Sequence, residues 1–157
     1  MIFVTVGTQK FQFNRLLTEI DNLCESNVIK SPVIAQTGSS SYEPKSFKTY
    51  KLLTQEKMND YISQADLVIT HGGTSSIFHA LKLQKKVIVV PRLQQYGEHV
   101  DNHQKEISEI LEMQGYISVA WDINDLQDLI LNIENINQKI YKGYSEMLVN
   151  EIKNYVK

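Results

Sequence analysis

Short apolar segments alternate along this chain with segments whose apolar residues recur every three or four positions. Residues 1–6, 33–38 and 65–70 are β-branched runs that end at or just before a glycine or His-Gly-Gly, and residues 86–90 form a fourth run closed by Pro91. Continuously apolar strands are buried on both faces, as in parallel sheets that carry helices on each side. The alternation therefore predicts a three-layer, Rossmann-like α/β fold with right-handed crossovers.

Helical segments and weaker strands complete this pattern. We expect helices over residues 12–25 and 55–64, after Gly73 with Thr74, Ser75 or Ser76 as the cap, and before Gly115, and weaker strands over residues 47–53 and 116–120. From residue 123 to residue 156 the apolar positions keep helical spacing for longer than one globular helix usually runs. A break is therefore expected near residues 135–143.

The chain is long enough for one hydrophobic core. Its 157 residues are 42% hydrophobic and 22% charged, so residues 1–157 are expected to form a single domain with residues 124–157 as a helical tail. Apolar runs such as Val87–Val90 are far shorter than the roughly 18 residues that cross a bilayer, and no secretion signal is evident. The single cysteine, Cys24, cannot form an internal disulfide or a Cys-based zinc site, which fits a cytoplasmic protein.

The charges are distributed unevenly along the chain. The whole chain has a formal net charge of only −2, which argues against nucleic-acid binding as its main task. Residues 1–97 hold 11 basic and 7 acidic side chains, whereas residues 98–157 hold 5 and 11. An anionic ligand is therefore expected to bind to the first part of the chain.

Glycine and hydroxyl residues follow three of the expected strands. These loops are Gly7-Thr8, Gly38-Ser39-Ser40-Ser41 and Gly72-Gly73-Thr74-Ser75-Ser76. Ligands of such sheets bind at the carboxyl ends of the strands, and a helix that starts after two glycines presents unpaired N–H groups suited to a phosphate. A glycine can also simply close a turn, but three such loops favour a phosphate site. The chain contains neither GxGxxG nor GxxxxGK[ST], which argues against NAD binding and P-loop hydrolysis.

The segment after residues 86–90 is dense in hydrogen-bonding side chains. Residues 91–104 are PRLQQYGEHVDNHQ, in which Arg92 can pair with phosphate and Asp101, Asn102 and Gln104 offer groups for sugar hydroxyls. An ordinary surface loop would be shorter and richer in Lys, Ser and Gly. The combination suggests a nucleotide-sugar as the ligand.

Three segments together resemble a known enzyme family. Residues 69–81 are ITHGGTSSIFHAL, and residues 89–92 and 97–104 are VVPR and GEHVDNHQ. They are similar to the C-terminal, donor-binding half of family 28 glycosyltransferases, which have the GT-B fold. The resemblance covers about residues 1–115. It is closest to split members, the soluble subunit of the two-part N-acetylglucosaminyltransferase of N-glycan assembly and its bacterial capsule and exopolysaccharide counterparts.

The resemblance implies a donor site spread over several loops. It implies that Gly7 and Thr8 approach the donor diphosphate, and that the diphosphate and nucleoside are held by His71, Gly72, Gly73, Thr74 and Ser75. It implies that the transferred sugar is contacted by His103 and Gln104. Arg92 and Glu98 are expected to belong to the same site. Where many members carry an acidic residue for the ribose hydroxyls, this chain has His79. A neutral imidazole can make one hydrogen bond there but cannot grip both hydroxyls of a diol.

The resemblance also implies a reaction and a partner. It implies an inverting transfer of a hexose or N-acetylhexosamine from a UDP-sugar to a lipid-linked acceptor, without a metal ion. It also implies a membrane-anchored, acceptor-binding subunit that holds this chain at the inner face of the membrane. His99 is the best candidate for the base in this chain, although a binding or structural role is the stronger alternative. His99 and His103 lack a third ligand for a metal site.

Two other functions remain open from the sequence. The chain could be a non-catalytic subunit that recruits or stabilises the membrane subunit through its acidic tail, although the same tail could simply cover the sheet. A free-standing nucleotide-binding protein is the weaker third alternative.

Overall fold

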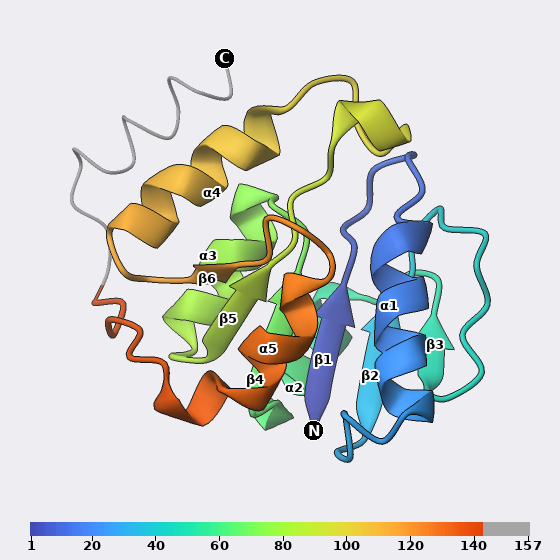
Figure 1. The fold of residues 1–157 in the computed structure, drawn as a ribbon, viewed down its shortest axis with the longest axis horizontal. Coiled ribbons are helices and arrows are strands. Elements are labelled where there is room, and N and C mark those ends of the chain that lie inside the picture. Colours follow the sequence, from blue (N-terminus) through green and yellow to red (C-terminus); the bar gives the residue numbers. More distant parts are fainter. Residues whose placement is uncertain (143–157) are drawn as a thin grey trace.

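A six-stranded, entirely parallel sheet forms the centre of the molecule (Figure 1). The computed structural model describes residues 1–142. The strands are β1 (Ile2–Thr5), β2 (Val33–Gln36), β3 (Lys48–Tyr50), β4 (Leu67–Thr70), β5 (Lys86–Val89) and β6 (Ser118–Val119). They lie in the order β3-β2-β1-β4-β5-β6. The predicted parallel α/β fold is confirmed, including the weaker strands at residues 47–53 and 116–120.

Helices precede or follow most of the strands, where the apolar spacing predicted them, although β2 and β3 are joined by a loop alone. They are α1 (Asn14–Glu25), α2 (Gln55–Gln64), α3 (Thr74–Lys82), α4 (His103–Met113) and α5 (Asp125–Leu131), with single 3₁₀ turns at η1 (Gln94–Tyr96) and η2 (Ile133–Asn135). Gly115, with φ of +82°, follows the end of α4, a position where the left-handed conformation favours glycine.

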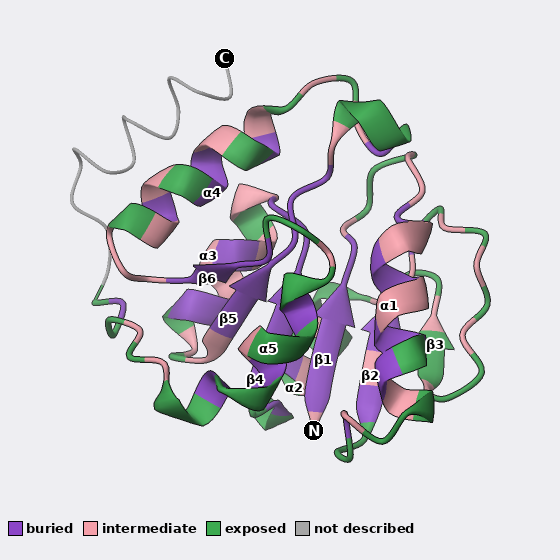
Figure 2. Cartoon of the chain, viewed as in Figure 1, coloured by how far each residue is buried: buried purple, intermediate pink, exposed green. Residues whose placement is uncertain are grey.

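The helices cover both faces of the sheet, which makes three layers (Figure 1). Side chains from α1 and α5 pack against Val4 and Ile69 on one face, and side chains from α2, α3 and α4 pack against Phe3 and Val68 on the other. The central strands β1 and β4 are therefore buried along their whole length (Figure 2). This double burial explains why these strands are continuously apolar.

The described part of the C-terminal stretch packs on the core. Helix α5 ends at Leu131, and residues 136–142 contain no helix, so the predicted break is present. Leu126 and Ile130 pack on the face covered by α1, and Tyr141 packs on the opposite face. The rest of the predicted tail, residues 143–157, lies outside the described residues. Within residues 1–142, no helix combines the length and the apolar character that crossing a membrane requires.

The strand order reverses between β1 and β4. From β1 the chain proceeds to β2 and β3 on one side, then returns to β4, β5 and β6 on the other. The loops after β1 and β4 therefore diverge at the carboxyl edge of the sheet. In open parallel sheets this point of divergence is where ligands bind.

Candidate functional site

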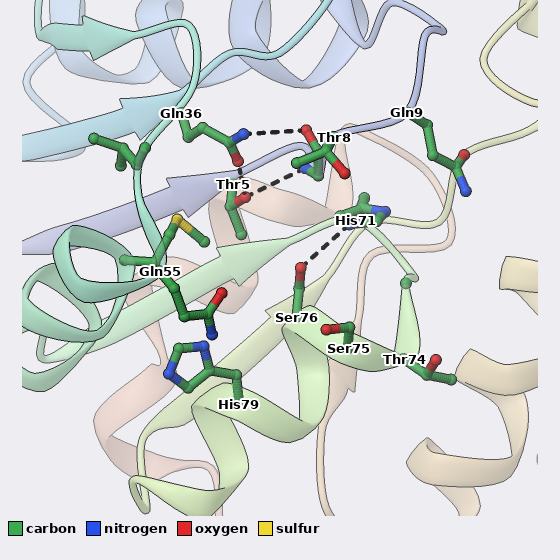
Figure 3. A pocket seen from close by; sticks show the side chains of 14 residues that line it. Thr5, Thr8, Gln9, Gln36, Gln55, His71, Thr74, Ser75, Ser76 and His79 are labelled. Carbon is green, nitrogen blue, oxygen red and sulfur yellow. Dashed lines mark hydrogen bonds between the residues drawn. The ribbon is translucent and has the colours of Figure 1, made fainter.

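A pocket of about 390 Å³ opens at this reversal point (Figure 3). It is lined by Thr5, Gly7, Thr8, Gln9, Gln36, Leu53, Gln55, Met58, His71, Gly73, Thr74, Ser75, Ser76 and His79. No aspartate, glutamate, lysine or arginine is among these lining residues. The pocket therefore offers neutral hydrogen-bonding groups and backbone N–H groups, and no carboxylate that would repel an anion.

The turn after β1 is held by two polar side chains at the ends of neighbouring strands. Thr5 Oγ1 donates to Gln36 Oε1 at 2.5 Å and accepts from the N–H of Gly7 at 3.2 Å, while Gln36 Nε2 donates to the carbonyl of Gly7 at 3.3 Å. Gly7 has φ of +79°, which favours glycine. Thr5 and Gln36 thus fix the backbone of one wall of the pocket.

The imidazole of His71 forms the floor between two glycines. A Cβ atom placed on Gly7 or on Gly73 would overlap the Nε2–Cε1 edge of this ring. Burial lowers the pKa of His71 to about 3, and the nearby positive charge of Arg92 acts in the same direction. His71 is therefore neutral near pH 7, and both glycines are needed for its ring to occupy the floor.

Helix α3 begins at the pocket without a side-chain cap. Gly73 is its N-cap residue, so the prediction that Thr74, Ser75 or Ser76 caps the helix is wrong. These three residues occupy the first turn instead and line the pocket. The first-turn N–H groups lack intrahelical partners and carry partial positive charge, which suits the oxygens of a phosphate.

His79 lies on α3 at the edge of the same pocket. Its Nε2 is 3.2 Å from Oδ1 of Asn59, and burial lowers its pKa, with Lys82 contributing in the same direction. A second, shallower pocket of about 410 Å³ continues from here and is lined by Gln55, Thr74, Ser75, Phe78, His79 and Lys82. His79 therefore lies where the two pockets meet.

The second glycine loop, residues 38–41, supports the first instead of lining the pocket. A Cβ atom on Gly38 would lie 2.9 Å from the carbonyl oxygen of Gly7. Ser40 Oγ accepts from the N–H of Phe13, and Ser41 Oγ accepts from Asn14 Nδ2. These bonds fix the start of α1, so this loop has a structural role here.

Arg92 is fully buried and uses its guanidinium within the protein. Nη1 donates to the carbonyls of Phe11, Gln12 and Glu98, and Nη2 donates to the carbonyl of Val6. The guanidinium also lies over the ring of Phe13, with Cζ 5.1 Å from the ring centroid. The structure corrects the expected phosphate contact: Arg92 is 0% exposed and outside the pocket, so it offers no accessible atom to a ligand.

Glu98 is also buried in an internal cluster. Its carboxylate accepts two hydrogen bonds from Arg15, each 3.0 Å long, and one from the N–H of Leu93. The guanidinium of Arg15 lies over the ring of Tyr96, which ties the loop between β5 and α4 to α1. Glu98 thus fixes this loop and does not line the pocket, contrary to its expected place in the donor site.

His99 and His103 share the carboxylate of Asp101. Nδ1 of His99 is 3.1 Å from one oxygen and Nδ1 of His103 is 3.5 Å from the other. His103 begins α4, but His99 precedes the helix, so the two imidazoles do not occupy successive turns. Neither lines the pocket. Within residues 1–142, no three His, Cys, Asp or Glu side chains are grouped as metal ligands would be.

Gln104 joins the loop after β4 to the loop after β5. Its Oε1 accepts from the N–H groups of Gly72 and Arg92, at 3.0 and 3.1 Å, and its Nε2 lies 3.2 Å from Nδ1 of His71. A Cβ atom on Gly72 would lie 2.7 Å from Cβ of Gln104, so Gly72 permits the close approach of α4. Gln104 and Gly72 thus lie directly behind the pocket and support it.

The expected site residues fall into two groups. Those that line the pocket are Gly7, Thr8, His71, Gly73, Thr74 and Ser75, and those that do not are Gly72, Arg92, Glu98, His99, His103 and Gln104. The sequence argument missed several lining residues: Thr5, Gln9, Gln36, Leu53, Gln55 and Met58. Gln36 carried a usable signal, since it is a polar residue near the end of an otherwise apolar strand.

Two curated relatives resemble part of this chain. The "UDP-N-acetylglucosamine transferase subunit ALG13" of Candida albicans is 31% identical over 93 residues, which are 59% of this chain and 30% of that protein. The "UDP-N-acetylglucosamine--N-acetylmuramyl-(pentapeptide) pyrophosphoryl-undecaprenol N-acetylglucosamine transferase 2" of Bacillus cereus is 29% identical over 102 residues, 63% of this chain and 26% of that protein. The matched parts thus span less than a third of either relative.

Two solved structures share the fold. The NMR solution structure of ALG13 superimposes with a TM-score of 0.64 at 18% identity, covering 96% of this chain and 94% of that one. The crystal structure of Acinetobacter baumannii MurG superimposes with a TM-score of 0.57 at 17% identity, covering 98% of this chain and 44% of that one. The second match equates this chain with less than half of a GT-B glycosyltransferase.

The family model agrees with both comparisons. The model "Glycosyltransferase family 28 C-terminal domain" matches residues 1–157. The chain therefore belongs to the family of glycosyltransferase family 28 C-terminal domains.

Proposed function

We propose that this chain is the donor-binding, catalytic subunit of a two-component inverting glycosyltransferase, and that its pocket binds a UDP-sugar. One observation carries the proposal. The turn at Gly7, the imidazole of His71 and the uncapped start of α3 converge on one pocket that no carboxylate lines. Neutral donors and a helix N-terminus suit a diphosphate, and the C. albicans relative is named as a UDP-N-acetylglucosamine transferase subunit.

The same groups suit the departure of a nucleoside diphosphate. In an inverting transfer the acceptor oxygen attacks the anomeric carbon while the bond to the diphosphate breaks, so negative charge develops on the leaving group. Fixed N–H donors stabilise such charge without a metal ion. We propose a metal-independent reaction on this basis, in which first-turn N–H groups of α3, together with Thr74 and Ser75, hold the diphosphate.

The base that takes the acceptor proton is proposed to come from the second subunit. His99 is outside the pocket and bonded to Asp101, so in this arrangement it has a structural contact instead of a free approach to the donor. A base must lie within hydrogen-bond reach of the proton that it removes. We therefore propose that the partner supplies the base. Within this chain, His99 is the candidate for that role that the sequence suggested.

The partner is proposed to supply the acceptor-binding half. The chain matches 44% of the MurG chain, and the ALG13 relatives are named as subunits, which fits a protein that completes its site with a second polypeptide. The B. cereus relative is named for a pyrophosphoryl-undecaprenol substrate, which supports a lipid-linked acceptor. We propose a membrane-anchored partner, a cytoplasmic location at the inner face of the membrane, and a role in capsule, exopolysaccharide or glycan synthesis.

Titration calorimetry tests donor binding directly. UDP and a panel of UDP-hexoses and UDP-N-acetylhexosamines are titrated into the purified chain, with ADP and GDP as nucleotide controls. The proposal predicts binding of UDP and at least one UDP-sugar. Transfer is then assayed after co-expression with the candidate membrane subunit and a lipid-linked saccharide. A purified chain that binds neither UDP nor any UDP-sugar would refute the proposal.

The alternative, a non-catalytic subunit that docks through its tail, makes a separate prediction. The described part of the tail is packed on the core through Leu126, Ile130 and Ile133. We expect deletion of residues 124–157 to unfold the core, because it exposes the sheet face that α5 covers. A truncated chain that stays folded but no longer co-purifies with the membrane subunit would favour the docking alternative.

A further inference from the structure

Gln104 is buried behind the pocket and makes hydrogen bonds in two opposite directions. The residue is 4% exposed and lies in the first turn of α4. Two backbone N–H groups, of Gly72 and Arg92, converge on one arm of its amide at 3.0 and 3.1 Å. That arm is therefore the oxygen, and the other arm, 3.2 Å from Nδ1 of His71, is the NH₂ group.

This orientation determines which nitrogen of His71 carries the proton. An NH₂ group can only donate, so Nδ1 of His71 must accept and be unprotonated. The ring is neutral, since burial lowers its pKa to about 3. A neutral imidazole has one protonated nitrogen, which leaves the proton on Nε2.

The protonated nitrogen faces the pocket. Nε2 lies in the edge of the ring that is enclosed by Gly7 and Gly73, and it is 3.4 Å from Oγ of Ser76 (Figure 3). A contact of 3.4 Å is long for a hydrogen bond, so this N–H is not committed to Ser76 and can donate to a closer acceptor in the pocket. Ser76 and Gly73 belong to the start of α3, where the proposed diphosphate binds.

We propose that Gln104 is a positioning residue that fixes His71 as its Nε2–H tautomer, so that the ring donates a hydrogen bond to an anionic oxygen of the ligand. The identity of that ligand as a diphosphate rests on the proposed function, whereas the tautomer does not. Gln104 then acts on the donor through His71 and does not contact the transferred sugar. Its burial, its absence from the pocket wall and the use of both amide arms within the protein support this assignment.

The tautomer is measured without any ligand. In ¹⁵N NMR of the imidazole ring of the full chain, the proposal predicts an unprotonated Nδ1 and a protonated Nε2, unchanged between about pH 5 and 8. Gln104→Glu keeps an oxygen for Gly72 and Arg92 but places an acceptor opposite Nδ1. We expect Nδ1 to become protonated in this variant. A protonated Nδ1 in the unaltered protein would overturn the proposal, whether or not the variant folds.

Binding of UDP and of a UDP-sugar separates positioning from sugar contact. The proposal predicts that Gln104→Glu weakens both ligands by the same factor, roughly tenfold or more, because both lose the bond from His71. Gln95→Glu makes the same charge change at an exposed position in the segment that precedes α4, and it should leave both affinities and the His71 spectrum unchanged. A loss confined to the UDP-sugar would show sugar contact and overturn the proposal.

The double variant provides a second check. If Gln104 acts through His71, then adding Gln104→Glu to His71→Ala should lower UDP affinity little further. If the two residues contacted the ligand independently, the losses of binding free energy in the two single variants would add in the double variant. If the unaltered protein binds neither UDP nor any UDP-sugar, the proposed function fails, and the ligand-free spectrum alone decides the role of Gln104.

Discussion

The pocket floor, residues 71–76 with Gly7, and the loop of residues 91–104 look equally functional in the sequence, yet the fold uses them in opposite ways. Both follow buried strands and both are rich in polar groups. On the floor, the helix N-terminus and Nε2 of His71 face the pocket. In the loop, Arg92, Glu98 and Gln104 direct their polar atoms into the protein. A segment rich in polar residues after a strand therefore indicates that the ligand site is nearby. It does not show which of those residues contact the ligand.

Removing the buried guanidinium of Arg92 is expected to have the largest effect. Arg92→Met leaves the carbonyls of Val6, Phe11 and Gln12 without their donor, so the free energy of unfolding should fall by about 3–5 kcal/mol. Urea denaturation followed by circular dichroism measures this loss. The folded fraction should bind UDP as before. A stable variant that no longer binds UDP would place Arg92 in the site after all.

Adding a methyl group to the floor should affect stability and binding together. Gly7→Ala strains a residue with φ of +79° and displaces the ring of His71, so we expect a loss of about 1–3 kcal/mol in stability and at least a tenfold loss in UDP affinity. Gly115→Ala is the matched control, since Gly115 has φ of +82° but lies at the end of α4. Calorimetry should show unchanged UDP affinity in the control. Equal losses of UDP affinity in Gly7→Ala and Gly115→Ala would contradict this account.

Acidification should destabilise the protein through His71. Its pKa is about 3 when folded because of burial and 6.5 when unfolded, so between these values the unfolded chain binds a proton that the folded chain does not. His71 therefore lowers the free energy of unfolding by about 1.4 kcal/mol for each pH unit below about 6.5. Denaturation at pH 7 and pH 5 should show a steeper loss for the unaltered protein than for His71→Gln. Parallel losses would mean that the ring is not buried in its neutral form.

Neutralising Glu98 should have the smallest effect. Glu98→Gln keeps the shape of the side chain but replaces one of the two oxygens that accept from Arg15 with an NH₂ group, which cannot accept. Because Arg15 is partly exposed and can bond to water instead, a loss of about 1 kcal/mol in stability is expected. UDP affinity should stay within the error of the calorimetric measurement. A clear fall in affinity would show that the loop contributes to the ligand site beyond its structural role.

The sequence predicted the sheet and its helices well because burial on both faces leaves a local signature. Strands such as Leu67–Thr70 are buried throughout and mostly apolar, and the glycines that follow three of the four clearest strands mark the carboxyl edge. The role of Arg92 had no such signature. Its partners Val6 and Phe11 are more than 80 residues away in the chain, and their carbonyls look the same in any sequence.

The cap of α3 was mispredicted for a related reason. Ser and Thr usually cap a helix, but here Gly73 takes the cap position because a side chain there would overlap His71. The hydroxyl groups of Thr74, Ser75 and Ser76 are displaced into the first turn. A local preference thus gave way to the packing of the pocket floor.

Calorimetric titration of UDP into Gly73→Asp tests the central claim, that the start of α3 binds the diphosphate. Aspartate is a favourable N-cap residue, and its carboxylate would meet the same N–H groups as the ligand and repel it. Because any Cβ at this position also displaces the ring of His71, Gly73→Ala is the matched control, and Gly73→Asp should bind UDP more weakly than this control. The account predicts that UDP binding to the folded variant falls by at least roughly a hundredfold, a loss of about 2.7 kcal/mol. A folded Gly73→Asp protein that binds UDP as tightly as the unaltered protein would contradict it.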